Sequence, residues 1–327
     1  MNKVKAFTFL FSAMIIFVSI AFAEDTWDVN EELIDNEEIE AVCNDQNPGD
    51  LYIPGRPVKP TRTETYDHCD TRPWFTRVNS ASFYIYKKLM HKRWVTVAFQ
   101  KGYSITHQGR MDYSKFVFDT WAIFWKEFDG FPFDSYTVAI GNNFKTCSAF
   151  GRGYDYPNTR TSHAAHEIYH AWNGNAFGQE GLRMWFLEGV TTYMGSIRQQ
   201  KENTYKQMME NFYTYYLNYR KQGKDRAIGN MSQWDDDYDH TFLAQKGSIV
   251  AYILDKELNK TGHHIGQVAK VLYRKYGITR QGMPSNEDIL SVFNEVSGID
   301  FASLFNKYLY SAKRLPLDSN FEWICHH

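Results

Sequence analysis

The sequence predicts an α+β protein in which a small β-rich amino-terminal part leads into a mostly helical part. Short runs of β-branched and aromatic residues lie before residue 141. After residue 163, apolar residues recur almost entirely at helical spacing. A group of His and Glu residues falls between 166 and 188, close to the change from one pattern to the other. Since strands and helices segregate in α+β domains, we expect this group to lie near their junction.

The β-rich part is expected to contain three strands and one amphipathic helix. Period-two runs of Val, Ile, Thr, Tyr and Phe predict strands at 83–86, 95–99 and 136–140. Between the second and third strands, four apolar residues at i, i+4, i+7 and i+11 predict one buried helix face: Val117, Trp121, Phe124 and Phe128.

The helical part is expected to contain six helices. The last of them has a capping box in Ser285 and Asp288. Aromatic residues make up 17% of the chain, and those spaced along 212–219 indicate a packed core rather than a ligand cage. The predicted helices cover 163–173, 184–200, 203–221, 245–259, 266–276 and 286–296.

The first 23 residues have the pattern of a secretory signal peptide. Lys3 and Lys5 precede an apolar stretch over 6–20, and Ala21-Phe22-Ala23 supplies an A-x-A cleavage site. An uncleaved membrane anchor is the alternative, because the apolar stretch is fairly long. We therefore expect a secreted, periplasmic or otherwise extracytoplasmic protein that has no membrane contact after cleavage.

Behind the signal peptide, the composition divides the chain into a leader over 24–72 and one domain over 73–327. Residues 24–50 carry eleven acidic residues and no Lys or Arg, which favours a solvated, poorly ordered segment. A propeptide-like shield over a basic cleft is the alternative. Frequent prolines between 51 and 73 indicate an extended segment that wraps the body.

The cysteines and the basic residues exclude some classes of site. Export predicts at least one disulfide among Cys43, Cys69, Cys147 and Cys325, with three connectivities open. A Cys43–Cys69 bridge would tether the leader. Because no C-x-x-C pattern is present, we do not interpret the cysteines as metal ligands. Lys and Arg form no clustered run, so the sequence does not indicate a nucleic-acid partner.

The group of His and Glu residues predicts a zinc hydrolase. Residues 166–170 read His-Glu-Ile-Tyr-His, and Glu188 follows after a Gly-containing segment. On a helix, His166 and His170 lie one turn apart on the same face. Two imidazoles and one carboxylate leave the fourth position of a Zn²⁺ ion open to water, from which Glu167 can accept a proton. We expect one zinc ion bound by His166, His170 and Glu188; a surface helix with a His and Glu face is the alternative.

The zinc motif and its neighbours resemble those of the gluzincins, in particular the glycyl aminopeptidase family. His170-Ala171-Trp172-Asn173 resembles the H-x-W-N of that family, and residues 185–193, which read W-F-L-E-G-V-T-T-Y, resemble its W-x-x-E-G-F-T-x-Y. Gln245-Lys246-Gly247 and Leu254-Asp255 recur in the same order. The resemblance covers about 110–320 and extends more distantly to the aminopeptidase N family. It implies a thermolysin-like zincin catalytic domain that acts on peptides or proteins.

The chain departs from the family in two places. The family has a tyrosine two residues before the Lys-Gly pair, where it helps to stabilise the tetrahedral intermediate, and here that position is Ala244. Tyr238 and His240, just upstream, are the nearest candidates for this catalytic donor; ordinary loop residues are the alternative interpretation. The Gly-rich substrate strand of the family is reduced to 151–155, from which the resemblance implies that Gly153 and Asp155 contact substrate. An exposed loop aspartate is the alternative for Asp155.

The sequence therefore predicts a secreted zinc metallopeptidase, either aminopeptidase-like or an endopeptidase. A catalytically weak scaffold that binds peptides or a partner protein is the alternative, favoured by Ala244. His163 is interpreted as a neighbour of the site, because a fourth protein ligand would close the position that the water needs. Thr192, one turn after Glu188, is a candidate to orient His166.

Overall fold

The structure is a computed structural model that describes part of the chain. The signal peptide and the four cysteines lie outside the described residues, so secretion and disulfide formation stay predictions. For the strands Ile39–Ala41, Thr76–Val78 and Gly153–Tyr156, only the backbone is described. The described residues are 39–41, 76–78, 82–131, 133, 135–141, 153–156, 159–174, 176–177, 183–197, 201–231, 239–278, 282–316 and 321.

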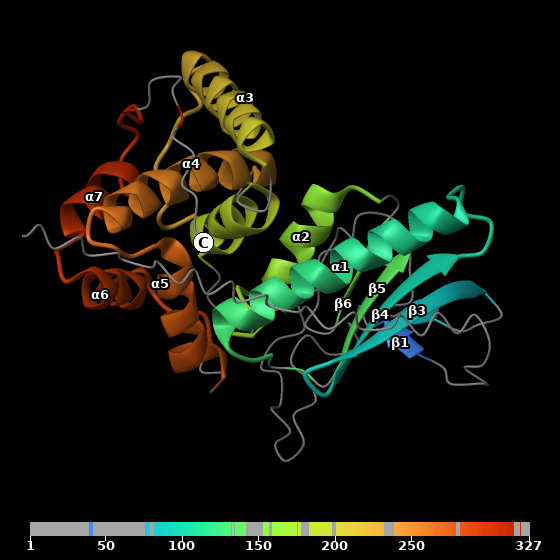
Figure 1. Cartoon of the computed structure of the whole chain (residues 1–327). Helices are drawn as coiled ribbons and strands as arrows, with labels where there is room; N and C mark the ends of the chain where they lie inside the picture. Colours follow the sequence, from blue (N-terminus) through green and yellow to red (C-terminus); the bar gives the residue numbers. More distant parts are fainter. Residues whose placement is uncertain are drawn as a thin grey trace, which may run out of the picture. The chain divides into compact units, whose positions relative to one another are not determined.

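A four-stranded sheet in the order β3-β4-β5-β6 forms the β part (Figure 1). β3 (Phe83–Met90) and β4 (Arg93–Gln100) form an antiparallel hairpin, whereas β5 (Ser135–Ile140) pairs in parallel with β4 and β6 (Gly153–Tyr156) in parallel with β5. A parallel step needs a crossover connection, and α1 (His107–Phe128) provides it between β4 and β5. The sheet and the helices that follow it confirm the predicted α+β class.

The β3–β4 hairpin is longer than the sequence predicts, because its turn lacks the usual residues. His91 and Lys92 form a two-residue turn with φ values of 48° and 65°. Such left-handed positions favour Asn and Gly, so the sequence pattern did not reveal the turn. The His91 ring is stacked on Trp125 of α1 with 4.6 Å between ring centroids, which holds the turn against the helix.

A second, two-stranded sheet pairs β1 (Ile39–Ala41) with β2 (Thr76–Val78) in antiparallel fashion. β1 lies within the acidic leader and packs beside β5 and β6. These three residues take part in a β-ladder, and the leader over 24–72 stays a prediction.

The predicted apolar face of α1 is confirmed: Val117, Trp121, Phe124 and Phe128 are all buried. Phe124 and Phe128 contact α2 (Thr161–His170) and the turn after it. The ring centroid of Phe124 lies 5.0 Å from that of Tyr169, and Phe128 is stacked on Trp172 at 5.5 Å. Aromatic packing of this kind fixes the helix that carries His166 and His170 beneath α1.

The helical part follows the predicted pattern, with differences at the helix ends. The helix predicted at 245–259 begins five residues earlier, at His240, because the Asp239 side chain caps it by accepting a hydrogen bond from the Phe242 amide at 2.9 Å. The last helix, α7, was not predicted. The remaining elements are η1 (Trp185–Val190), η2 (Thr192–Ile197), α3 (Glu202–Lys221), α4 (His240–Asn259), α5 (Ile265–Leu272), η3 (Tyr273–Gly277), α6 (Asn286–Ser297) and α7 (Ala302–Tyr308).

The helix formed by η1 and η2 crosses two neighbours at backbone contact. A Cβ atom built on Gly189 would lie 2.5 Å from the Cα atom of Gly247 in α4. A Cβ atom on Gly195 would lie 2.7 Å from the Ala165 carbonyl oxygen in α2. Only glycine permits such close approach, so these positions set the distance of the η1–η2 helix from α4 and from α2.

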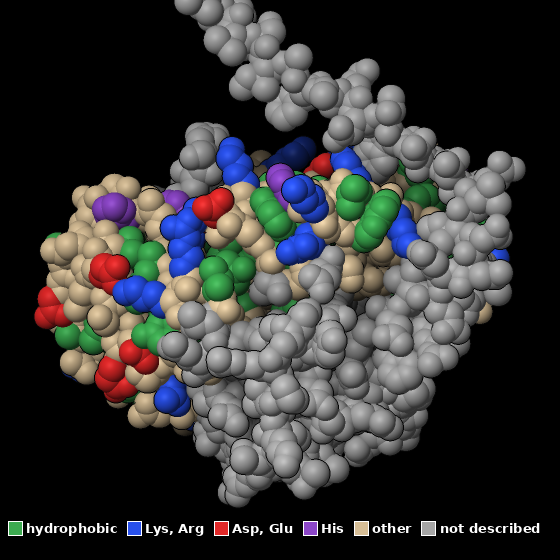
Figure 2. All heavy atoms as spheres, turned by 90° about the horizontal axis from the view of Figure 1, so that it is seen from below, with side chains coloured by type: hydrophobic (Ala, Val, Ile, Leu, Met, Phe, Trp, Pro, Cys, Tyr) green, Lys and Arg blue, Asp and Glu red, His purple; other side chains and the backbone are tan. Residues whose placement is uncertain are grey.

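Among the described residues, no helix combines the length and apolar character that crossing a membrane requires. On the face drawn in Figure 2, basic, acidic and apolar side chains are intermingled. Such a mixture is typical of a solvent-exposed surface.

Gly247→Ala should lower the free energy of unfolding by about 1–3 kcal/mol, because the new methyl group must push η1 away from α4. Gly109→Ala in the first turn of α1 is the matched control, since its methyl group would meet only the side chains of Ile105 and Thr106. We expect the control to change stability by less than about 1 kcal/mol. Urea unfolding of the two variants measures the difference, and equal midpoints would contradict the close crossing.

Candidate metal centre

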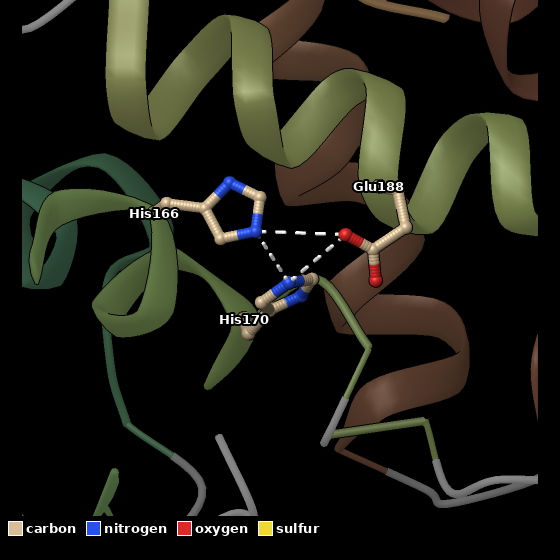
Figure 3. Close-up of side chains that lie close together, drawn as sticks. All are labelled: His166, His170 and Glu188. Carbon is tan, nitrogen blue, oxygen red and sulfur yellow. Dashed lines mark hydrogen bonds and ion pairs between the residues drawn. The ribbon is translucent and has the colours of Figure 1, made fainter. Parts of the chain in front are cut away.

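Three side chains from two helices converge on one point (Figure 3). His166 and His170 come from successive turns of α2, and Glu188 comes from η1. The two His Nε2 atoms are 3.0 Å apart, and Glu188 Oε2 lies 3.5 Å from that of His166 and 3.7 Å from that of His170. The structure thus brings together all three residues that the sequence predicts as metal ligands.

The spacing of these atoms fits a zinc ion. Ligand atoms at 2.0–2.2 Å from a tetrahedral ion lie about 3.3–3.6 Å from each other, and the observed separations of 3.0–3.7 Å bracket this range. Within the described part of the chain, no fourth His, Cys, Asp or Glu joins the group. Two imidazoles and one carboxylate with an open fourth position form the ligand set of catalytic rather than structural zinc sites.

The electrostatics of the group also call for a cation. All three side chains are largely buried, with 13%, 8% and 11% of the His166, His170 and Glu188 side chains exposed. Burial alone would raise the pKa of Glu188, but His170 and hydrogen bonds from His166, His170 and His240 hold it well below its usual value. Burial lowers the pKa of His170, and the opposing effect of Glu188 raises it to about 9. Two Nε2 atoms at 3.0 Å need a positive charge between them, either a proton or a metal ion.

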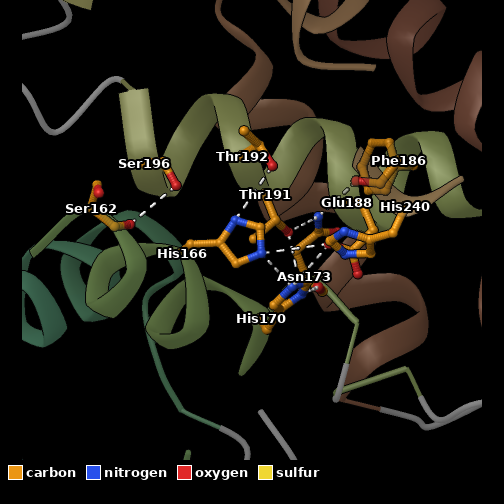
Figure 4. Close-up of polar contacts among 10 residues, drawn as sticks. All are labelled: Ser162, His166, His170, Asn173, Phe186, Glu188, Thr191, Thr192, Ser196 and His240. Atoms are coloured by element: carbon orange, nitrogen blue, oxygen red, sulfur yellow. Dashed lines mark hydrogen bonds and ion pairs between the residues drawn. The ribbon is translucent and has the colours of Figure 1, made fainter. Parts of the chain in front are cut away.

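Asn173 fixes the orientation of His170 (Figure 4). The Asn173 carbonyl oxygen lies 3.2 Å from His170 Nδ1 and accepts a hydrogen bond from its N–H group, which leaves Nε2 free to bind a metal. The Asn173 side-chain amide donates to the Phe186 carbonyl oxygen at 3.0 Å and to Thr191 Oγ1 at 2.9 Å. One residue therefore joins the end of α2 to the helix that carries Glu188.

His166 is oriented by the neighbouring threonine, as the sequence suggested. Thr192 Oγ1 lies 3.4 Å from His166 Nδ1. One turn further along, the Ser196 hydroxyl donates to the Ser162 carbonyl oxygen of α2 at 3.1 Å. These contacts run along the same side of the η1–η2 helix (Figure 4) and add polar links to the close packing at Gly195.

Aromatic residues of the two motifs hold the same helices from outside. Trp172 Nε1 donates to the Gly130 carbonyl oxygen at 2.6 Å, at the end of α1. Trp185 Nε1 donates to Asn286 Oδ1 of α6 at 2.8 Å. The Tyr193 hydroxyl donates to the buried Asp255 of α4 at 2.8 Å. These contacts explain why the metal motifs include aromatic residues several positions away from the ligands.

Glu167 occupies the position next to the first ligand on α2. Glu188 is the main cause that raises the pKa of His170 and that of His240, and Glu167 adds a smaller contribution in the same direction. Its carbonyl oxygen accepts a hydrogen bond from the buried Tyr136 of β5 at 3.2 Å. The pKa of Tyr136 is raised well above its usual value by burial and by Glu167, so this tyrosine stays a neutral donor.

His240 is the first residue of α4 and lies beside the candidate ligands. Its Nε2 atom is 3.1 Å from Glu188 Oε2, the oxygen that faces the two other ligands. Its side chain is 57% exposed, so it borders the opening of the site. His240 therefore belongs to the first turn of a helix capped by Asp239 rather than to a loop, and its role as a catalytic donor stays a prediction. Tyr238, the other candidate, lies outside the described residues.

Of the other residues predicted at or near the site, the structure describes His163 with its side chain but only the backbone of Gly153 and Asp155. His163 is half-buried on the first turn of α2, where burial and the nearby His166 lower its pKa, and it is not part of the ligand cluster. β6 pairs Gly153 with Thr137 and Asp155 with Ala139, and Ala139 belongs to a small apolar cluster separate from the main core. A substrate-binding role for Gly153 and Asp155 stays a prediction.

Removing a ligand should remove the metal. We expect the purified chain to bind one zinc ion, His166→Ala and His170→Ala to bind none, and His163→Ala to keep it. Zinc-loaded protein should also melt at a higher temperature than chelated protein, because a ligand that binds only the native state stabilises it. Elemental analysis after dialysis measures the stoichiometry; full zinc occupancy in both ligand variants would rule out this site.

Asn173→Ala should weaken zinc binding by about 10–100-fold, the usual cost of losing a residue that orients a metal ligand. Asn259→Ala is the matched control, because its side-chain amide also donates to a backbone carbonyl, that of Asp255, at the opposite end of α4. Competition with a chromophoric chelator gives both affinities. Unchanged affinity in Asn173→Ala would show that His170 needs no support from this residue.

The fold is similar to that of M1 zinc metallopeptidases. A structure from Idiomarina loihiensis, described as an aminopeptidase N family protein, is 19% identical with a TM-score of 0.58 and covers 71% of this chain and 47% of that one. The M1 zinc metallopeptidase from Deinococcus radiodurans is 14% identical with a TM-score of 0.55 and covers 76% of this chain and 60% of that one. A variant of the latter, bound to a Tyr-Ser-Ala substrate, is 13% identical with a TM-score of 0.54 and covers 78% of this chain and 60% of that one.

These structures share the fold across most of this chain, although the chain spans only 47–60% of their length. No protein-family profile matches the chain. No curated protein sequence matches it either. The similarity agrees with the resemblance found in the sequence: the chain has the fold of the aminopeptidase N type of zinc metallopeptidase.

Proposed function

We propose that this chain is a zinc-dependent peptidase that hydrolyses peptide bonds. The observation that carries the proposal is the group of His166, His170 and Glu188, whose ligand atoms lie 3.0–3.7 Å apart, with Glu167 next to the first ligand. The similarity of the fold to M1 zinc metallopeptidases supports it. A ligand set with an open fourth position suits hydrolysis, because water and substrate can both reach the ion.

Different residues of the chain would bind the metal ion and transfer the proton during hydrolysis. His166, His170 and Glu188 would hold one zinc ion, which when bound polarises the attacking water and the scissile carbonyl. Glu167 accepts a proton from the water as the water oxygen bonds to the carbonyl carbon. The same carboxyl group then donates this proton to the nitrogen of the departing amine as the carbon–nitrogen bond breaks. The second proton of the water passes from the new carboxyl group to the amine, so the products are a carboxylate and an ammonium group, and Glu167 ends ionised as it began.

We extend the proposal to the substrate class and the location of the enzyme. A peptide bound to the variant from Deinococcus radiodurans supports peptides as the substrate class here. The apolar stretch and A-x-A pattern of residues 1–23 support export to an extracytoplasmic compartment. We further propose that the domain is a zincin of the thermolysin type, with its small sheet beside the zinc helix.

A peptide-binding scaffold without strong catalysis is the second candidate. Ala244 favours it, because the sequence family to which the chain is similar has a tyrosine there that takes part in catalysis. Such a scaffold would bind zinc and peptides but would release no products.

Glu167→Gln separates the two functions, because it removes the proton acceptor and leaves the ligand atoms in place. We expect zinc-dependent cleavage of a peptide library by the wild type, detected by mass spectrometry, and a loss of at least about 10²-fold in Glu167→Gln. Glu257→Gln is the charge-matched control and should cleave normally. Glu257 lies on the solvent side of α4 and pairs only with Lys260 among the contacts described. A wild type that binds zinc and cleaves nothing would establish the scaffold instead.

A further inference from the structure

One position on α4 differs from what the resembling family leads us to expect, and a histidine lies one helical turn before it. Ala244 occupies the place of the catalytic tyrosine, and His240 lies four residues before it. Residues at i and i+4 of a helix lie one above the other on the same face. Both positions belong to α4 (His240–Asn259). The chain therefore lacks a hydroxyl on one turn and carries an imidazole on the turn next to it.

We propose that His240 replaces the missing tyrosine and stabilises the oxyanion that forms from the scissile carbonyl. The inference rests on the proposed peptidase function and names a catalytic residue for it. The group that acts is the Nε2–H of His240. Without such a donor, the negative charge on the substrate oxygen would lack a hydrogen bond from the protein at this side of the site.

The contact of His240 with Glu188 shows that this nitrogen carries a proton and faces the site. A carboxylate that serves as a metal ligand is ionised and can only accept a hydrogen bond. His240 Nε2 lies 3.1 Å from Glu188 Oε2, and it must therefore be the donor. Figure 4 shows the His240 ring alongside Glu188, on the same side as the converging ligands.

His240 is placed to reach a substrate rather than to bind the metal itself. It does not join His166, His170 and Glu188 in a common ligand group, so it leaves the fourth position open. Its side chain is 57% exposed, against 11% for Glu188, and it can turn from the carboxylate toward a substrate at the opening. Its backbone is fixed, because Asp239 caps the helix and accepts a further hydrogen bond from Tyr219 at 2.8 Å.

The small side chain of Ala244 is consistent with this exchange of roles. Long helical side chains lean back over the preceding turn, so a tyrosine at 244 would extend toward the turn that carries His240. Its hydroxyl and the imidazole would then compete for the same space. An alanine leaves that space to His240.

The reaction step remains balanced with His240 included. As the water oxygen bonds to the carbonyl carbon, the π electrons move onto the carbonyl oxygen, and the Nε2–H of His240 donates a hydrogen bond to this oxygen without transferring its proton. When the carbon–nitrogen bond breaks, the electrons return to form the carboxylate and the hydrogen bond weakens. Of the protein's residues, Glu167 alone carries a proton from water to the amine. His240 therefore acts by charge stabilisation and needs no change of protonation state.

The test uses a peptide that the wild type cleaves and a phosphinic peptide of the same sequence, which mimics the tetrahedral intermediate. We expect His240→Ala to lower kcat by about 10²-fold, the usual effect of losing one oxyanion donor, with KM nearly unchanged. It should bind the phosphinic peptide more weakly by a similar factor and keep one zinc ion per chain. His240→Gln, which retains a donor, should recover part of both losses. Thr241→Ala, an exposed neighbour, should behave as the wild type.

Placing a tyrosine one turn away provides the decisive rescue. Ala244→Tyr in the His240→Ala background should regain kcat and phosphinic peptide affinity by about tenfold or more, because it restores the hydroxyl at the family's position. Wild-type kcat and phosphinic peptide affinity in His240→Ala would overturn the inference while leaving the peptidase function standing. Loss of zinc from His240→Ala would also overturn it, by making His240 part of metal binding. Failure of the wild type to cleave any peptide would instead overturn the proposed function on which the inference rests.

Discussion

The metal centre depends on how closely the η1–η2 helix approaches its two neighbours. Gly189 follows Glu188 directly and lies against the backbone of Gly247, while Gly195 lies against α2 next to His166. Any side chain at these glycines would push the helix outward by an ångström or more. Metal–ligand distances tolerate only about 0.2 Å, so such a shift would take Glu188 out of range of an ion held by α2. Backbone packing, more than any single polar contact, therefore sets the geometry of the site.

Within that frame, a small polar network determines which atoms face the ion. The Asn173 carbonyl oxygen accepts a hydrogen bond from Nδ1–H of His170, and Thr192 contacts Nδ1 of His166. Both Nε2 atoms are thereby directed to the same point, where Glu188 brings a negative charge into a largely buried space. Such an arrangement costs free energy unless a cation compensates it. The network therefore directs its ligand atoms to one point where a positive charge is needed, and a bound metal ion would supply that charge.

The sequence was sufficient for those parts of the site that follow from helical spacing. His166, Glu167 and His170 are fixed on one helix by their positions alone, and the glycines before Glu188 indicated a second helix folded back on the first. Other parts depend on tertiary contacts that no local pattern contains. Asn173 was visible only as the end of a motif, and its bonds to Phe186 and Thr191 required the fold. The first turn of α4 was missed because its cap, Asp239, follows a stretch with no helical periodicity.

The start of α4 has a consequence for the chemistry of the whole site. A histidine in a loop would need ordering by substrate, whereas one in the first turn of a capped helix has its backbone already fixed. Successive turns of a helix are about 5.4 Å apart, and an imidazole and a tyrosine ring differ in reach. The proposed donor at His240 would therefore approach a substrate from a different side than a tyrosine at position 244. Differences in specificity from the M1 metallopeptidases of similar fold are expected to originate at this face of α4.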